Sequence, residues 1–156
     1  MSESRPIVRA SGEGDLLRTQ VERVVKARGA DTAGALSFTV VTSEPGFAGP
    51  GLHRHLRNAE AFYILEGTFR FRVADDEHTV EPHGFVFVPP KVAHAFVSAD
   101  GAGGKMIVMF MPGDFAGYFD EIAEIHARRG TRDEIASVQA KYGMETLGPP
   151  IGRDHD

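Results

Sequence analysis

The stretch LHRHLRNAEAFYILEG, residues 52–67, places two histidines one residue apart and a glutamate five positions after the second of them. Residues i and i+2 of a β-strand point to the same face, so His53 and His55 would project side by side toward one point. The residues between His55 and Glu60 give the chain room to bend, and Glu60 can then reach that point from an adjacent strand. His94 is the best candidate for a fourth donor, because it also lies in a β-rich run.

Three imidazoles and one carboxylate form a donor set that suits a borderline divalent transition metal, and an octahedral ion would keep two positions open. We therefore expect one divalent metal ion per chain, on His53, His55, Glu60 and His94. The donor set does not distinguish iron, manganese, nickel, cobalt, copper and zinc. The competing interpretation is a chance His-x-His pair, with Glu60 as a solvated residue at the end of a strand.

The amino-acid composition is typical of one soluble domain that does not use cysteine chemistry. The chain has 156 residues, of which 42% are hydrophobic and 25% charged, a size and balance typical of a single globular domain. It contains no cysteine, which excludes disulfides, thiolate metal ligands and thiol nucleophiles. A formal net charge of -5 without a Lys/Arg cluster argues against nucleic-acid and membrane partners. The sequence shows neither a signal peptide nor an apolar run of about 20 residues, so we expect a cytoplasmic protein.

Residues 35–111 form a succession of short β-rich runs separated by turn residues. The run TFRFRV, residues 68–73, alternates between apolar and polar side chains, as a strand with one buried face does. Short strands at this spacing, without helical patterns between them, predict an all-β antiparallel sandwich or barrel. The expected strands are 35–42, 59–65, 68–73, 77–80, 85–88, 92–98 and 105–111.

The two ends of the chain have a different character. Residues 114–143 are expected to form two helices, with Asp114 as the N-cap of the first and a capping box at Thr131 opening the second. Gly143 would end the second helix and begin a tail over residues 144–156. Residues 1–33 form an N-terminal extension. Periodicity alone favours a helix there, on the spacing of Leu17, Val21, Val24 and Val25.

The histidine motifs resemble those of the cupins. The first cupin motif has His-x-His, three or four residues, Glu, six residues and Gly, and this chain has His53, His55, Glu60 and Gly67 at those spacings. The second motif corresponds to residues 89–98 and includes His94. The resemblance covers about residues 35–111 and implies a jelly-roll β-barrel in which the four residues bind one metal ion. The chain departs from the motifs at Lys91, which replaces a glycine, at His83-Gly84, and at Ser98, which replaces the closing asparagine.

The flanking segments resemble a narrower group, the small bacterial cupins called quercetin-dioxygenase-like. The matching residues are Asp31-Thr32, Gly34, Asp114 to Phe119, Tyr142-Gly143-Met144 and Gly148-Pro149-Pro150. This resemblance implies a single domain over residues 1–156, a strand near Val24 in place of the helix, and a metal-dependent dioxygenase. In dioxygenase cupins the glutamate ligand, here Glu60, can also act as the catalytic base. A redox-neutral cyclase or isomerase and a non-catalytic binding protein remain as alternatives.

Strand alternation predicts the rest of the pocket once the four ligands point inward. The expected lining residues are Phe38, Phe62, Ile64, Phe96, Ser98, Met106, Val108 and Phe110. Because this lining is apolar, we expect a small apolar or aromatic substrate, flavonol- or polyketide-like, bound to the metal through oxygen. Sugar phosphates or free amino acids would need Arg or Lys inside. Exposed sheet edges and an apolar outer face, here Tyr63, Leu65 and Val97, predict a homodimer.

Overall fold

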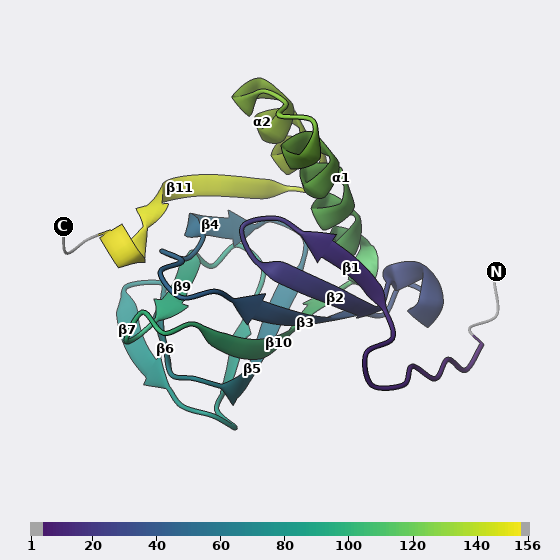
Figure 1. Ribbon diagram of the computed structural model, residues 1–156. Coiled ribbons are helices and arrows are strands. Elements are labelled where there is room, and N and C mark those ends of the chain that lie inside the picture. The colour runs from purple at the N-terminus through teal and green to yellow at the C-terminus, as the bar shows by residue number, and fades with distance from the viewer. Residues whose placement is uncertain (1–4, 154–156) are drawn as a thin grey trace.

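Two antiparallel β-sheets face each other in a jelly roll, and two α-helices follow near the C-terminal end (Figure 1). The computed structural model describes residues 5–153. Within that range the six-stranded sheet has the order β1-β2-β3-β10-β5-β8, and the five-stranded sheet has the order β11-β4-β9-β6-β7. The predicted fold class, an antiparallel jelly roll with two helices near the C-terminus, is confirmed.

The expected strands between residues 35 and 111 all form, with ends shifted by a few residues. The strands are β1 (Asp15–Arg18), β2 (Glu22–Ala27), β3 (Ser37–Ser43), β4 (Gly51–His55), β5 (Ala59–Glu66), β6 (Phe69–Val73), β7 (Asp76–Val80), β8 (Phe85–Val88), β9 (His94–Ser98), β10 (Gly104–Met111) and β11 (Met144–Pro150). The helices are α1 (Ala116–Ala127) and α2 (Arg132–Lys141), with short 3-10 turns η1 (Gly29–Thr32), η2 (Gly113–Phe115) and η3 (Ile151–Arg153).

The core lies between the two sheets and follows from strand alternation. In β10, Met106, Val108 and Phe110 are buried and alternate with half-buried residues. The five-stranded sheet contributes Phe69 and Phe71 of β6, which are fully buried. Burying apolar surface contributes about 25 cal/mol per Å², so these large side chains supply much of the free energy that holds the sheets together.

Strand β3 has the opposite phase to the one expected. Thr39 and Val41 are buried, whereas Phe38 is only half-buried. The strand register gives the reason: Thr39 lies opposite Val108 of β10, and directly opposed residues of an antiparallel pair share a face. Phe38 lies opposite Met109 and shares the outer face with it. The assignment of Phe38 to the pocket lining is therefore wrong, because a shift of one residue in phase moves every side chain of a strand to the other face.

Both ends of the chain add strands to the sheets. The helix favoured by the periodicity of residues 17–25 is wrong: this segment forms the hairpin β1–β2, and β2 pairs along β3. The strand near Val24 that the cupin resemblance implied is present as β2. The expected tail is also wrong in part, because β11 pairs with β4. Gly143 makes this return with a φ of +69°, a backbone conformation that suits glycine.

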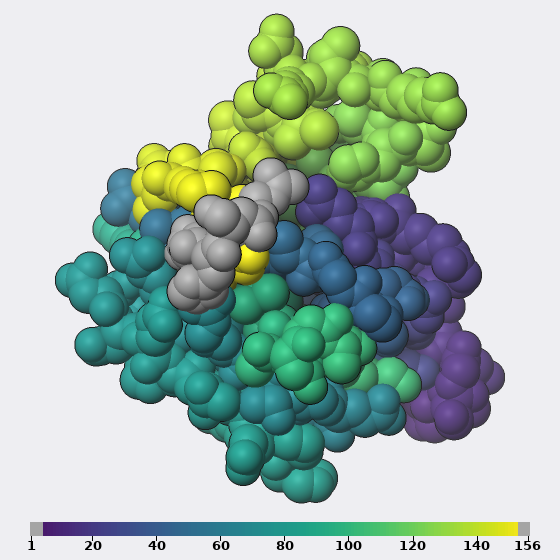
Figure 2. Space-filling model, turned by 60° about the vertical axis from the view of Figure 1, so that its left-hand side comes forward, coloured from purple at the N-terminus to yellow at the C-terminus, as the bar shows by residue number. Residues whose placement is uncertain are grey.

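The helices close one end of the barrel. Thr131 caps α2 as expected: its hydroxyl accepts from the Glu134 N–H at 3.2 Å, and the Glu134 side chain accepts in return from the Thr131 N–H. Asp114 is not the N-cap of α1; it lies within η2 and accepts a hydrogen bond from the Asn58 amide at 3.0 Å. Figure 2 shows the helices projecting beside the N-terminal strands and β11. Among the described residues, neither helix is long and apolar enough to cross a membrane.

The outer face proposed for dimerisation is partly covered by the chain itself. Val97 is 7% exposed and packs in a small cluster with Ala95 and Ile151, the first residue of η3. The prediction that Val97 belongs to an exposed outer face is therefore wrong. Tyr63 and Leu65 are half-buried, and the homodimer stays a prediction.

The departure from the second cupin motif at Lys91 has a structural cost. Lys91 has a φ of +72°, a left-handed conformation that is unfavourable by about 1–2 kcal/mol for a residue with a Cβ. Its N–H donates to the carbonyl oxygen of His55 at 2.7 Å, which ties this turn to the end of β4. The turn keeps the left-handed backbone conformation that a glycine would adopt without strain. The hydrogen bond to the end of β4 is therefore retained, and Lys91 is locally strained.

Replacing Lys91 with glycine is expected to raise the free energy of unfolding by about 0.5–1 kcal/mol, because the relief of strain exceeds the extra freedom of glycine in the unfolded chain. Urea unfolding measures the change. The matched control is Lys105→Gly within β10, which is expected to lower the free energy of unfolding by about the same amount. A destabilised Lys91→Gly variant would contradict the strain assignment.

Candidate metal centre

Four buried side chains from both sheets meet between the layers of the jelly roll. His53 and His55 come from β4 and His94 from β9, and His53 and His94 are directly opposite each other in the strand register. Glu60 comes from β5, in the other sheet. The expectation of an adjacent strand for Glu60 is thus wrong, because residues 56–58 carry the chain across the barrel. One ligand atom from each residue lies within 4.8 Å of the others.

Backbone carbonyls orient two of the three imidazoles. The Nδ1 atom of His53 lies 2.7 Å from the Gly51 oxygen, and Nδ1 of His94 lies 3.0 Å from the Val92 oxygen. A carbonyl can only accept, so each Nδ1 carries a proton and Nε2 is the nitrogen directed toward the cluster. This is the arrangement that outer partners impose on metal-binding histidines.

The imidazole of His55 has polar atoms without partners. Both of its ring nitrogens are buried, and neither has a hydrogen bond among the described residues. A buried polar atom without a partner costs about 1–3 kcal/mol, which a coordinating ion would offset. The neighbouring rings offer no hydrogen-bond acceptor: His55 packs edge-on against Phe115 at 4.4 Å and Phe110 at 5.1 Å, measured between ring centroids.

Glu60 supplies the negative charge of the cluster. Its Oε1 lies 3.2 Å from Nε2 of His94, and its Oε2 lies 3.6 Å from Nε2 of His55. Burial alone would raise the pKa of Glu60, but the close contacts and charges of His55 and His94 outweigh it and hold the pKa below its usual range. The carboxyl group is therefore ionised and able to act as a ligand.

The histidine pKa values follow from burial and from Glu60. Burial and the neighbouring His94 lower the pKa of His53 to about 3, so its ring is neutral and its Nε2 lone pair is available. Burial would also lower the pKa of His94, but contact with Glu60 outweighs it and raises that pKa. A metal ion at the centre would take the place of the proton shared by His94 and Glu60.

The residues present fit a single divalent metal ion. The cluster combines an ionised carboxylate, two imidazoles held with Nε2 inward, and a third imidazole that forms no hydrogen bond. Within residues 5–153 it is the one group of three or more potential ligands whose donor atoms converge in this way. Nitrogen and oxygen donors in this ratio are compatible with several transition metals, so the identity of the ion does not follow from the geometry.

A cavity of about 340 Å³ opens onto the cluster, a volume within the range of small-molecule sites. Of the residues expected to line it, Phe62, Phe96, Val108 and Phe110 do so. Ile64 and Met106 are fully buried but are not lining residues, so they pack behind the cavity wall. Ser98 also lies outside the lining, and its hydroxyl bonds to Asp100 at 3.0 Å.

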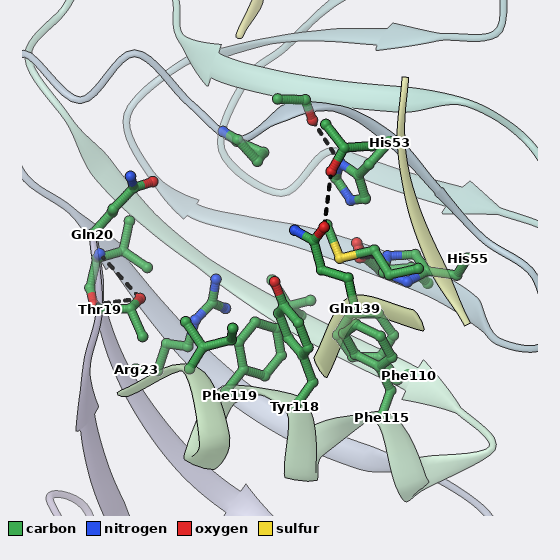
Figure 3. A pocket seen from close by; sticks show the side chains of 18 of the residues that line it. Thr19, Gln20, Arg23, His53, His55, Phe110, Phe115, Tyr118, Phe119 and Gln139 are labelled. Carbon is green, nitrogen blue, oxygen red and sulfur yellow. Dashed lines mark hydrogen bonds and ion pairs between the residues drawn. The ribbon is translucent and has the colours of Figure 1, made fainter. Parts of the chain in front are cut away.

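Sequence reasoning missed the polar side of this cavity. Arg23 of β2, Tyr118 of α1 and Gln139 of α2 all line it, and Figure 3 shows their polar ends directed into the space below His53. The only signal in the sequence was that Arg23 falls in the same alternating phase as Val21 and Val25, and the sequence analysis did not assign a face to this strand. On β2, Arg23 pairs with Val41, an inward-facing residue of β3, and so points inward as well.

Comparison with known proteins agrees with this architecture. Residues 39–110 match the family model described as a cupin domain. An RmlC-like cupin from Shewanella frigidimarina is 22% identical and superposes with a TM-score of 0.57, over 72% of this chain and 95% of that one. A variant of Streptomyces PAC13 with uridine is 10% identical, with a TM-score of 0.61 over 95% of both chains. A comparison with curated protein sequences found no significant match. The match to the cupin model thus covers the central β-rich segment, and the structural likenesses establish the fold alone.

Proposed function

We propose that this cupin is a metal-dependent enzyme, a dioxygenase that acts on a small, largely apolar aromatic or polyketide-like substrate bound through an enol or phenol oxygen. The observation that carries the proposal is the complete donor set at the inner end of a cavity with aromatic walls. When bound, a divalent transition metal would supply Lewis acidity and open coordination positions.

The chain's own residues support this chemistry in three ways. The carboxylate of Glu60 is ionised and buried beside the cavity, where it can accept a proton from a substrate hydroxyl. Phe62, Phe96 and Phe110 offer planar apolar surface, which favours a ring system over a sugar by about 25 cal/mol per Å² buried. The same rings keep water away from the reacting atoms.

The same donor set would also serve a redox-neutral cyclase or isomerase, and a ligand-binding protein without catalysis could use the same cavity. A dioxygenase differs from both in consuming molecular oxygen together with its substrate. Oxygen consumption is therefore the measurement that separates the three functions.

Oxygen uptake is expected when the protein, reconstituted separately with iron, manganese, nickel, cobalt or copper, is given flavonols or related phenolic enols. At least one of these metals should support one oxygen molecule consumed per substrate. The zinc-loaded protein is the matched control, since zinc has no redox chemistry and should bind substrate without uptake. Substrate conversion without oxygen consumption would favour the cyclase or isomerase, and binding without conversion would favour the binding protein.

A further inference from the structure

The cavity contains a positive charge that the metal cluster does not explain. Arg23 extends from β2 into the cavity from the side opposite His53 and His55 (Figure 3). Its strand partners are apolar on both sides: Leu17 on β1 and Val41 on β3 lie directly opposite it in the register. The residue as a whole is half-buried, but its Nε is buried without a partner, which is unusual for a charged side chain.

The guanidinium of Arg23 is not paired with an acceptor or a carboxylate of the described chain. Among residues 5–153 it forms no hydrogen bond and no ion pair, and its Nε is buried without any acceptor. Burial lowers the pKa of Arg23 to about 10, while the charges of Glu60 and Tyr118 act in the opposite direction. The group therefore remains charged at neutral pH, and the charge is one that a bound anion would offset.

The one contact that holds the guanidinium leaves its donors free. Its central carbon lies 3.8 Å above the centroid of the Phe119 ring. Stacking of this kind uses the face of the planar group, whereas its N–H donors point outward in the plane. The Phe119 ring holds one face of the guanidinium, and the N–H donors along its edge are not used by the described chain. Such a group can bind a planar carboxylate with two parallel hydrogen bonds.

We infer that Arg23 binds a carboxylate group of the ligand, at the end of the cavity away from the metal cluster. This inference rests on the proposed function for the other end of the ligand, and it narrows the substrate class to an aromatic acid. A single guanidinium matches the single charge of a carboxylate, and the aromatic walls between Arg23 and the cluster fit an apolar body. The expectation of an apolar lining does not hold at this residue.

Titration of the zinc-loaded full-length protein tests the inference without turnover. The probes are 4-methylcatechol, which lacks a carboxylate, and three acids with tethers of increasing length: 3,4-dihydroxybenzoate, 3,4-dihydroxyphenylacetate and 3-(3,4-dihydroxyphenyl)propionate. At least one acid is expected to bind about tenfold more tightly than 4-methylcatechol, because charge-assisted hydrogen bonds are strong. Arg23→Met should abolish that preference and leave the affinity for 4-methylcatechol unchanged.

Two further variants separate recognition from packing. Arg23→Lys keeps the positive charge but not the planar group with two parallel N–H donors, and it should retain only part of the preference for the acid. Arg18→Met, on the exposed strand β1, should retain all of it. An acid preference that survives in Arg23→Met would overturn the inference, and so would equal binding of the acids and 4-methylcatechol by the unaltered protein.

A second measurement keeps the inference distinct from the proposed function. In metal-free protein, 3-phenylpropionate is expected to raise the melting temperature more than its neutral amide, and Arg23→Met should remove the difference. If this difference and the titration result hold while no oxygen uptake is found with any metal, the dioxygenase proposal fails and the carboxylate site stands. If oxygen uptake is found and neither ligand preference depends on Arg23, the carboxylate site fails alone.

Discussion

Replacing His55 with alanine is expected to lower the affinity for a divalent metal ion by more than about 100-fold, since changes to residues that merely support metal ligands already cost 10–100-fold. His55 is the cluster member whose two ring nitrogens form no hydrogen bond in the described structure, which is the arrangement expected of a metal ligand. The expected result is about one ion per chain in the unaltered protein after reconstitution, and close to none in His55→Ala.

Elemental analysis after reconstitution and gel filtration measures the metal content. The control is His78→Ala, because His78 lies on the exposed face of β7 and should leave the content unchanged. Binding to the folded state also adds to stability, so the metal should raise the melting temperature of the unaltered protein and of His78→Ala, but not that of His55→Ala. Equal occupancy in the two variants would contradict the assignment of His55 as a ligand.

The metal-site candidates could be predicted from the sequence because their spacing is local. His53 and His55 share a face by strand geometry, which holds in any sheet. The strand from which Glu60 reaches the cluster could not be predicted in this way, since the bend at residues 56–58 leads across to the other sheet. Sequence spacing showed that the residues could converge, but it did not show from which side each would come.

The strands between residues 35 and 111 could be predicted from alternation and turn residues. The incorrect predictions, for the phase of β3 and for the C-terminal tail, have a common cause. The phase of β3 depends on its register with β10, which places Thr39 rather than Phe38 opposite Val108. Strand β11 forms because it pairs with β4, although the segment contains two prolines and a glycine. In both cases long-range pairing decided the outcome, and local propensity contained no information about it.

Arg23 shows how a wrong element assignment can conceal a functional residue. Spaced apolar residues between positions 17 and 25 suggested a helix, on which a single arginine would be a solvated side chain. On β2 the same residue alternates inward with Val21 and Val25, both buried. The cupin resemblance correctly implied a strand near Val24, but the face on which Arg23 lies was decided by the pairing of β2 with β3.

Replacing Phe115 with alanine is expected to lower the free energy of unfolding by about 3–5 kcal/mol, as large-to-small changes of buried phenylalanines do. Phe115 is 1% exposed and lies in η2, where the chain passes from the barrel into α1. Its ring stacks on Tyr118 at 4.9 Å and packs at a tilt against Phe110 at 4.4 Å, so one side chain joins the helices to the inner face of β10. The same ring meets His55 edge-on at 4.4 Å, and its loss would also leave that imidazole less firmly held.

Urea unfolding measures this loss, and Phe85→Ala is the matched control. Phe85 is 60% exposed on the edge strand β8, so its truncation removes the same atoms without opening a buried cavity, and a change within about 0.5 kcal/mol is expected. If the helices were attached mainly through their own pairing, Phe115→Ala would cost no more than the control. A large difference between the two variants would instead place the junction of barrel and helices at Phe115, beside the candidate ligand His55, and make the wall of the cavity part of the core.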